Sequence, residues 1–303
     1  MKDARANVAA SPLAVAGRSA WSPRDFLSLT KPRLNVLVVA TSAAGYYLGA
    51  PARPDLVAMT EAVVGTAMVA GGAAALNQVY ERQTDALMRR TRLRPLPDGR
   101  LTSVEATLFG LVLAGGGLAV LAQYTNLLAA LLALATLLTY VLWYTPMKRR
   151  SPAATMIGAI PGALPPLIGW AASSGSVGVG GLALFAIVFL WQIPHFMAIA
   201  WLYREDYGRA GFPMLPVIDP KGERAGLQAV IYAVMLVPAS IVPALIGLSG
   251  LPYLIFAVVS GVVLLWLSVR FAKTRSEASA RALFLGSITY LPLLWIAMIF
   301  AKL

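Results

Sequence analysis

Long apolar segments alternate with short polar loops along almost the whole chain. Nine segments can be placed, each about 17–25 residues long, which is the length that a helix needs to cross the hydrocarbon core of a membrane. They lie at residues 34–50, 56–80, 102–122, 126–144, 153–172, 179–203, 226–247, 251–269 and 282–301. The pattern predicts an all-α polytopic membrane protein with nine transmembrane helices.

The composition agrees with a membrane protein. Of the 303 residues, 58% are hydrophobic and 13% are charged, whereas about a quarter of the residues are charged in soluble domains. The absence of cysteine excludes disulfides, thiolate metal sites and a cysteine nucleophile. The net charge of +12 could suggest a nucleic-acid partner, but the positions of the basic residues indicate membrane topology instead.

The basic residues cluster on one side of this layout. Of the 25 Lys and Arg, all but Arg53 and Lys302 fall on the same side, and basic loops favour the cytoplasm. We therefore expect a protein of the bacterial inner membrane with a cytoplasmic N-terminus and an extracytoplasmic C-terminus. Residues 1–26 would form a cytoplasmic tail and an interfacial lead-in, and 27–303 one transmembrane domain. The two long loops, 81–101 and 204–225, would both be cytoplasmic, and function is expected there.

One row of polar residues stands at the end of the second apolar segment. Asn77, Glu81 and Asp85 are spaced i, i+4, i+8, so on a helix they fall within an arc of about 80°. Oxygen ligands grouped in this way suit Mg²⁺, which bridges to phosphate oxygens. Arginines that suit a polyanion follow at once, at positions 89, 90, 92 and 94. The row indicates a metal–diphosphate site, and the alternative is a helix end with acids and bases mixed for solubility.

A second group of polar residues lies in and after the sixth segment. His195 and Asp206 are eleven residues apart, close to three helical turns, so they would share one helix face. Glu205 and Asp206 are expected at the same depth as Glu81 and Asp85, and four converging carboxylates would be relieved by a divalent cation. The alternative is that Glu205 and Asp206 pair with neighbouring arginines.

His195 is the only histidine and follows Pro194 inside an apolar segment. Ionisable residues within the membrane are costly and tend to be functional. Three roles remain open: a hydrogen bond to a backbone carbonyl freed by Pro194, a haem ligand, or a general base. Lys148, after the fourth segment, could reach the same phosphates or be part of an ordinary basic cluster. The fifth segment is expected to bend around a pocket, because it contains Pro161, Pro165 and Pro166.

The row from Asn77 to Asp85 resembles the first Asp-rich motif of the intramembrane prenyltransferases of the ubiquinone-biosynthesis type. Within that superfamily, four further motifs resemble those of the haem O synthases, the protoheme IX farnesyltransferases. The motifs are YTPMKRRSP, IGAIPGALPPLIGW, WQIPHF and REDYGRAGFPMLPV. The resemblance extends over nearly the whole chain from about Leu27.

The resemblance implies nine helices around a central cavity open to the cytoplasm, Mg²⁺ dependence, and farnesyl diphosphate and haem b as substrates. A farnesyl group would join a haem vinyl carbon with addition of water, giving haem O and diphosphate for haem–copper oxidases. The catalytic candidates are Asn77, Glu81, Asp85, Asp206 and His195, and the metal set adds Glu205. The candidates for binding diphosphate or haem propionates are Arg89, Arg90, Arg94, Lys148, Arg149 and Tyr207. The second motif departs from the paired aspartates of the superfamily, since only Glu205-Asp206 precedes Tyr207.

The implied partners are the lipid bilayer and, downstream, a haem A synthase or haem–copper oxidase assembly, with no nucleic acid. Two other functions compete. A prenyltransferase for a quinone-ring acceptor is disfavoured, because such enzymes lack the WQIPHF histidine and the AGFPMLP run. A secondary transporter would place its acids near the midplane, whereas the acids here are expected at one interface. Diphosphate release with and without Mg²⁺, on addition of farnesyl diphosphate and haem b, would discriminate among them.

Overall fold

The structure is a computed structural model that describes residues 22–51 and 53–303. Most of the expected N-terminal tail, residues 1–21, therefore lies outside the described residues. The first half contains α1 (Pro23–Leu29), α2 (Pro32–Gly49), α3 (Leu56–Leu87), α4 (Ser103–Tyr124), α5 (Leu127–Leu138), the π-helix η1 (Thr139–Tyr144) and α6 (Thr145–Met147). The second half contains α7 (Ala154–Ser174), α8 (Val179–Leu202), α9 (Arg204–Arg209), α10 (Leu215–Ile218), α11 (Glu223–Leu245), α12 (Leu251–Thr274) and α13 (Glu277–Phe300).

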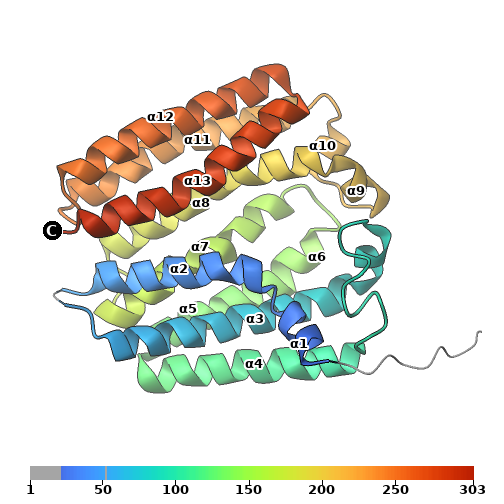
Figure 1. Ribbon diagram of the computed structural model, residues 1–303, viewed down its shortest axis with the longest axis horizontal. Helices are drawn as coiled ribbons and strands as arrows, with labels where there is room; N and C mark the ends of the chain where they lie inside the picture. The colour runs from blue at the N-terminus through green and yellow to red at the C-terminus, as the bar shows by residue number, and fades with distance from the viewer. Residues whose placement is uncertain (1–21, 52) are drawn as a thin grey trace, which may run out of the picture.

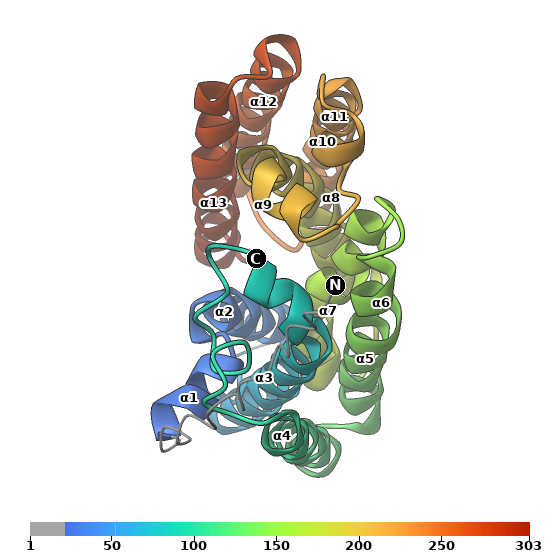
Figure 2. The ribbon, with the colours of Figure 1, turned by 90° about the vertical axis from the view of Figure 1, so that its right-hand side faces the viewer.

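The long helices lie side by side, and the short helices α1, α9 and α10 gather near one end of the bundle (Figure 1). Helix α3 packs on α2 and α4, α7 on α2 and α8, and α8 on α11 and α13. Seen from the end that carries α9 and the loop after α3, the helices surround a common centre (Figure 2). The termini of several helices thus meet at one end of the molecule.

Eight helices of the described chain are long and apolar enough to cross a membrane. They are α3, α4, the continuous run Leu127–Met147, α7, α8, α11, α12 and α13. Large apolar side chains such as Val112 and Leu142 are 75% and 67% exposed, as expected for surfaces that face lipid. The protein is therefore an all-α integral membrane protein. Helix α2 is not among the eight, and its first turns contain Arg33 and Asn35.

Two element boundaries change the sequence-based interpretation. Helix α3 continues to Leu87, seven residues past the expected end of its apolar segment at residue 80, so the whole polar row is helical. Helix α8 ends at Leu202, and Tyr203, at φ −111° and ψ 21°, separates it from α9. The expectation that His195 and Asp206 share one helix face is therefore wrong. By contrast, α7 continues through its three prolines as one helix.

Helices α2 and α7 are in backbone contact. A Cβ atom on Gly45 would lie 2.0 Å from the carbonyl oxygen of Pro166, and one on Gly169 would lie 1.9 Å from that of Ser42. Only glycine allows this approach, which is a common way for helices to pack in membranes. At the other end of the chain, Lys302 Nζ donates 2.7 Å hydrogen bonds to the carbonyl oxygens of Tyr47 and Ala50. The last residues thereby tie the bundle to the end of α2.

Candidate active site

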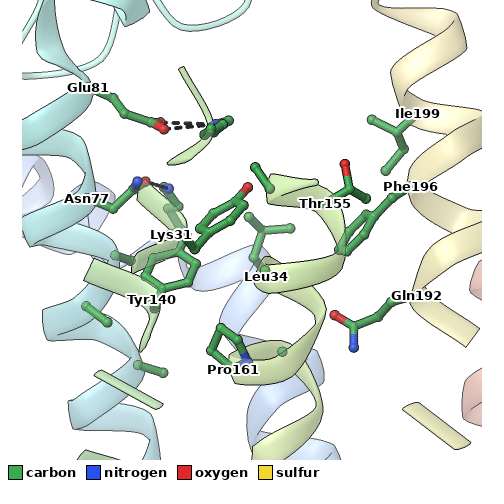
Figure 3. Close-up of a pocket in the computed structure, with 18 of the residues that line it drawn as sticks. Lys31, Leu34, Asn77, Glu81, Tyr140, Thr155, Pro161, Gln192, Phe196 and Ile199 are labelled. Atoms are coloured by element: carbon green, nitrogen blue, oxygen red, sulfur yellow. Dashed lines mark hydrogen bonds and ion pairs between the residues drawn. The ribbon is translucent and has the colours of Figure 1, made fainter. Parts of the chain in front are cut away.

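A cavity of about 500 Å³ lies between α2, α3, η1, α7 and α8. One part of its wall is polar and comes from α3, the loop after it and the ends of α1 and α6. The rest is mainly apolar, and Figure 3 shows Leu34, Pro161 and Phe196 facing the same space as Glu81 and Asn77. The cavity thus joins a charged region to an apolar one.

The polar row on α3 lines this cavity. Asn77, Glu81 and Asp85 are 1%, 2% and 1% exposed, and all three contribute to the cavity wall. Their spacing places them on one face because α3 remains helical through Asp85. Buried carboxylates are unfavourable unless they are paired or bind a metal.

Each member of the row is paired with a cation from another part of the chain. The pairs are Lys31 Nζ to Asn77 Oδ1 at 2.9 Å, Lys148 Nζ to Glu81 Oε1 at 3.0 Å, and Arg94 to Asp85 Oδ2 at 2.7 Å. Figure 3 labels Lys31, Asn77 and Glu81 at this end of the cavity. Three cations thus surround two carboxylates, and this excess of positive charge suits a polyanion such as diphosphate.

Asp85 provides an observation that tests whether a metal fits. Its Oδ2 binds Arg94, but its Oδ1 is buried without any hydrogen-bond partner in the structure. A buried unpaired carboxylate oxygen requires an explanation, and a bound cation is one. With Glu81 and the amide oxygen of Asn77, it forms a set of oxygen donors of the kind that Mg²⁺ prefers. The residues therefore fit a divalent cation.

The amide of Asn77 has a fixed orientation. Its Nδ2 donates a 3.1 Å hydrogen bond to Thr145 Oγ1, which in turn donates one of 2.7 Å to the carbonyl oxygen of Tyr140. Oδ1 is therefore left for Lys31. Thr145 follows the π-helix η1, and this type of helix is frequent at functional sites. It places Tyr140 and Tyr144 in the cavity wall.

Lys31 is a site residue that the sequence analysis does not identify, because it is one of many basic residues on the same side of the predicted membrane. It lies between α1 and α2 in a left-handed conformation, with φ 50°, which is uncommon for residues other than glycine. Its burial, together with the nearby positive charges of Arg94 and Lys148, lowers the pKa of Lys31 to about 8. A left-handed backbone conformation at a residue other than glycine is often found at functional sites. The Lys31-Pro32 pair before the first apolar segment is the sequence signal that could have revealed Lys31 as a site residue.

The second acidic motif lies elsewhere. The Glu205 side chain is 80% exposed and lies 3.8 Å from Arg209, and the Asp206 side chain is 13% exposed and lies 3.4 Å from the same guanidinium. Among the described residues, no group of three or more His, Asp or Glu side chains is arranged to hold a metal. The expected convergence of four carboxylates is therefore not found, because the chain turns at Tyr203 before it reaches them.

The basic candidates divide into two groups. Arg90, Arg94 and Lys148 line the cavity, together with Tyr207. The Arg90 guanidinium lies 4.9 Å from the ring centroid of Tyr203 and 4.8 Å from that of Tyr207, distances typical of cation–π contacts. Arg89 and Arg149 are exposed and do not line the cavity.

His195 also lines the cavity, from the middle of α8. Its Nδ1 lies 2.8 Å from the hydroxyl of Ser287 on α13. The partner of the imidazole is therefore not a carbonyl freed by Pro194. Together, the two ends of the cavity present a cation-rich pocket for an anion and an imidazole among apolar side chains.

A helical membrane bundle with an acidic row, surrounding cations and an apolar cavity is the architecture expected of a prenyl-diphosphate transferase. Residues 38–297 match the UbiA prenyltransferase family, and the chain belongs to that family. Its relatives include proteins named protoheme IX farnesyltransferase. That of Solibacter usitatus is 46% identical over 281 residues, covering 90% of this chain and 96% of the relative, and that of Anaeromyxobacter dehalogenans is 42% identical over 300 residues, covering 99% and 98%.

Solved structures share the fold at low sequence identity. A structure described for digeranylgeranylglyceryl phosphate synthase has a TM-score of 0.78 at 19% identity, covering 92% of this chain and 97% of that one. A UbiA homolog from Archaeoglobus fulgidus bound to GPP and Mg²⁺ has a TM-score of 0.63 at 17% identity, covering 91% and 99%.

Proposed function

We propose that the protein transfers a farnesyl group from farnesyl diphosphate to a vinyl group of haem b, with addition of water, giving haem O and diphosphate. The observation that carries this proposal is the buried row of Asn77, Glu81 and Asp85 at the charged end of the cavity. The farnesyltransferases named above, similar over nearly their full length, support the choice of substrates.

The oxygen atoms of Asn77, Glu81 and Asp85 would hold Mg²⁺ at the charged end. When bound, the ion supplies positive charge that neutralises the leaving diphosphate. The homolog of the same fold bound to GPP and Mg²⁺ supports a role for Mg²⁺ in this proposal. Asp206, with a side chain 13% exposed on α9, pairs with Arg209 and does not line the cavity, so in this proposal it joins the set only when substrate binds. The exposed carboxylate of Glu205 does not belong to this set.

In this proposal three cations pair with the α3 row in the free protein and with the diphosphate when substrate is bound. Without substrate, Lys31, Lys148 and Arg94 pair with the α3 row. When the diphosphate binds, they release the row and bind the diphosphate oxygens, so the charge of the leaving group is stabilised as the C–O bond breaks. Arg90 and Tyr207 line the same region and would hold a second anionic group, such as a haem propionate.

The apolar part of the cavity would hold the farnesyl chain. Leu34, Val38 and Ile199 contribute side chains there, and burial of an isoprenoid among them is favourable. This environment also protects the allylic cation from water until the acceptor carbon attacks it. The rings of Tyr140 and Tyr144 lie in the wall beside Glu81 and Lys148, where a cation would be stabilised by their faces.

The topology in this proposal has nine spans, with α2 as the first. Its packing between α3 and α7, and the bond from Lys302 to its end, support counting it as a span. With the basic loops in the cytoplasm, the N-terminus is cytoplasmic, the C-terminus extracytoplasmic, and the cavity opens to the cytoplasm. Residues 27–303 form one domain in the bacterial inner membrane, and a haem A synthase or haem–copper oxidase assembly receives the product.

The test uses membranes that contain the full chain. Farnesyl diphosphate and haem b are added with Mg²⁺ or with a chelator, and diphosphate release and the mass of the extracted haem are measured. We expect both products only with Mg²⁺ and both substrates. A quinone-ring acceptor in place of haem b serves as the control. An unchanged haem mass, with prenylation of the quinone ring, would overturn the choice of acceptor.

A further inference from the structure

The imidazole of His195 is held in one plane by rings from its own helix, α8, and from α13. Its ring stacks against Trp191, at 5.0 Å between centroids and 20° between planes, and against Phe284, at 5.3 Å and 27°. Trp191 is itself fixed, because its indole N–H donates a 2.7 Å hydrogen bond to the carbonyl oxygen of Ser287. The same stretch of α13 thus positions both the imidazole and the ring stacked on it.

The hydrogen bonds around Ser287 favour one tautomer of His195. The Ser287 hydroxyl has a single proton, and its Oγ lies 2.7 Å from the carbonyl oxygen of Phe284 and 2.8 Å from His195 Nδ1. A helical serine commonly donates to a carbonyl of the preceding turn. With the proton placed there, Nδ1–H must donate to Ser287. Nε2 then keeps its lone pair and is the ring nitrogen that can bind a ligand in the cavity that His195 lines.

We propose that His195 binds the iron of haem b through Nε2, and that Ser287 is the residue that positions it. A neutral imidazole is a common axial ligand of haem iron. Histidines that bind metals usually donate their other N–H to an oxygen, which fixes the tautomer and makes the ligand more basic. This inference rests on the proposed function, since haem b must be the acceptor substrate.

The surroundings of the ring favour a ligand over a general base. A base becomes a positively charged imidazolium after it takes a proton. The contacts found around the ring are three aromatic side chains and one hydroxyl, and none of them offers a negative charge. The carboxylates of Glu81 and Asp85 are paired with cations of their own. A coordinated imidazole stays neutral, so it needs no counter-charge.

The test measures haem binding without farnesyl diphosphate and without Mg²⁺. The full chain in lipid nanodiscs is mixed with ferrous haem b, and the iron–histidine stretching band is recorded by resonance Raman spectroscopy. We expect this band in the wild-type protein. His195→Ala should lose it, and added imidazole should restore an iron–imidazole band. Ser287→Ala should shift the band to lower frequency and weaken haem binding by about 10- to 100-fold, whereas Ser287→Thr should keep both near the wild-type values.

Ser268→Ala is the matched control. Ser268 is also a fully buried serine that donates to a helix carbonyl, that of Leu264, but it lies on α12 and is not the partner of His195. Its haem spectrum should equal that of the wild type. An iron–histidine band that persists in His195→Ala would overturn the inference. Normal haem binding by His195→Ala with loss of farnesyl transfer alone would also overturn it and would identify His195 as a general base. If the wild type binds no haem at all, haem b is not the acceptor and the proposed function is wrong. This outcome differs from failure of the ligand assignment alone, in which haem binds but not through His195.

Discussion

The pair formed by Lys148 and Glu81 allows a quantitative test of the site. Both carboxylate oxygens of Glu81 lie near Lys148 Nζ, at 3.0 and 3.2 Å. The Lys148 side chain is 14% exposed and the Glu81 side chain 3%. Removing one partner of a buried ion pair costs about 3–5 kcal/mol, because a charge is left without compensation. Since this carboxylate lines the cavity and Lys148 is still 14% exposed, we expect Lys148→Met to fall near the lower limit, at about 3 kcal/mol of unfolding free energy.

A double-mutant cycle separates the pair from other effects. Glu81→Gln in the Lys148→Met background removes the uncompensated charge, so most of the lost stability should return, with a coupling energy of about 2–3 kcal/mol. Unfolding of each variant in mixed micelles of increasing SDS content gives the free energies. Arg150→Met is the control, because Arg150 is an exposed basic residue two positions away. Additive single effects, or a loss below about 1 kcal/mol for Lys148→Met, would refute the pairing.

Activity should respond differently from stability. Loss of one charge-assisted hydrogen bond to diphosphate costs about 1.5–3 kcal/mol, so Lys148→Met should lower kcat/KM for farnesyl diphosphate by about 10- to 150-fold. The double variant should regain stability but not activity, because it also lacks Glu81, a proposed ligand of the metal. A near-wild-type kcat/KM of the folded Lys148→Met variant would mean that Lys148 serves the fold alone.

Three further predictions concern the metal, the packing and the topology. Asp85→Asn should abolish turnover while leaving the protein folded and extractable, since it removes a carboxylate ligand; near-normal haem O production would contradict the metal assignment. Gly169→Ala should destabilise the protein by about 1–3 kcal/mol through overpacking, whereas Gly115→Ala, with no atom within 4 Å of the added carbon, should be tolerated. A reporter fused after Leu303 should be active only outside the cytoplasm, and cytoplasmic activity would mean that the number of spans is wrong by one.

The helices were predictable from the sequence because a membrane imposes a length of about 20 apolar residues on each of them. The row on α3 was predictable for a related reason, since helical periodicity alone places Asn77, Glu81 and Asp85 on one face. The end of α8 was not, because Tyr203 is neither glycine nor proline and gives no sign of a break. The second motif therefore turned away from the position that continuous helical periodicity predicted.

The partners within the site could not be predicted from one sequence. Lys31 meets Asn77 across 46 positions, Thr145 meets it across 68, and Ser287 meets His195 across 92. No local pattern encodes such distant contacts, because they depend on how the helices pack. Serine and threonine within apolar helices commonly bond to their own helix backbone, so the sequence does not distinguish Thr145 or Ser287 as site residues.

The pairing of the α3 row also has a consequence for the order of membrane insertion. Lys148 follows Glu81 by 67 positions, which at about 5–20 residues per second of synthesis corresponds to a delay of about 3–13 seconds. Glu81 must enter the membrane region before its main counter-charge has been made, with only Lys31 already available. Synthesis of Lys148 thus completes the pairing of Glu81, so a newly made chain that stalls before Lys148 would expose an acid without its main counter-charge to the quality-control machinery of the membrane.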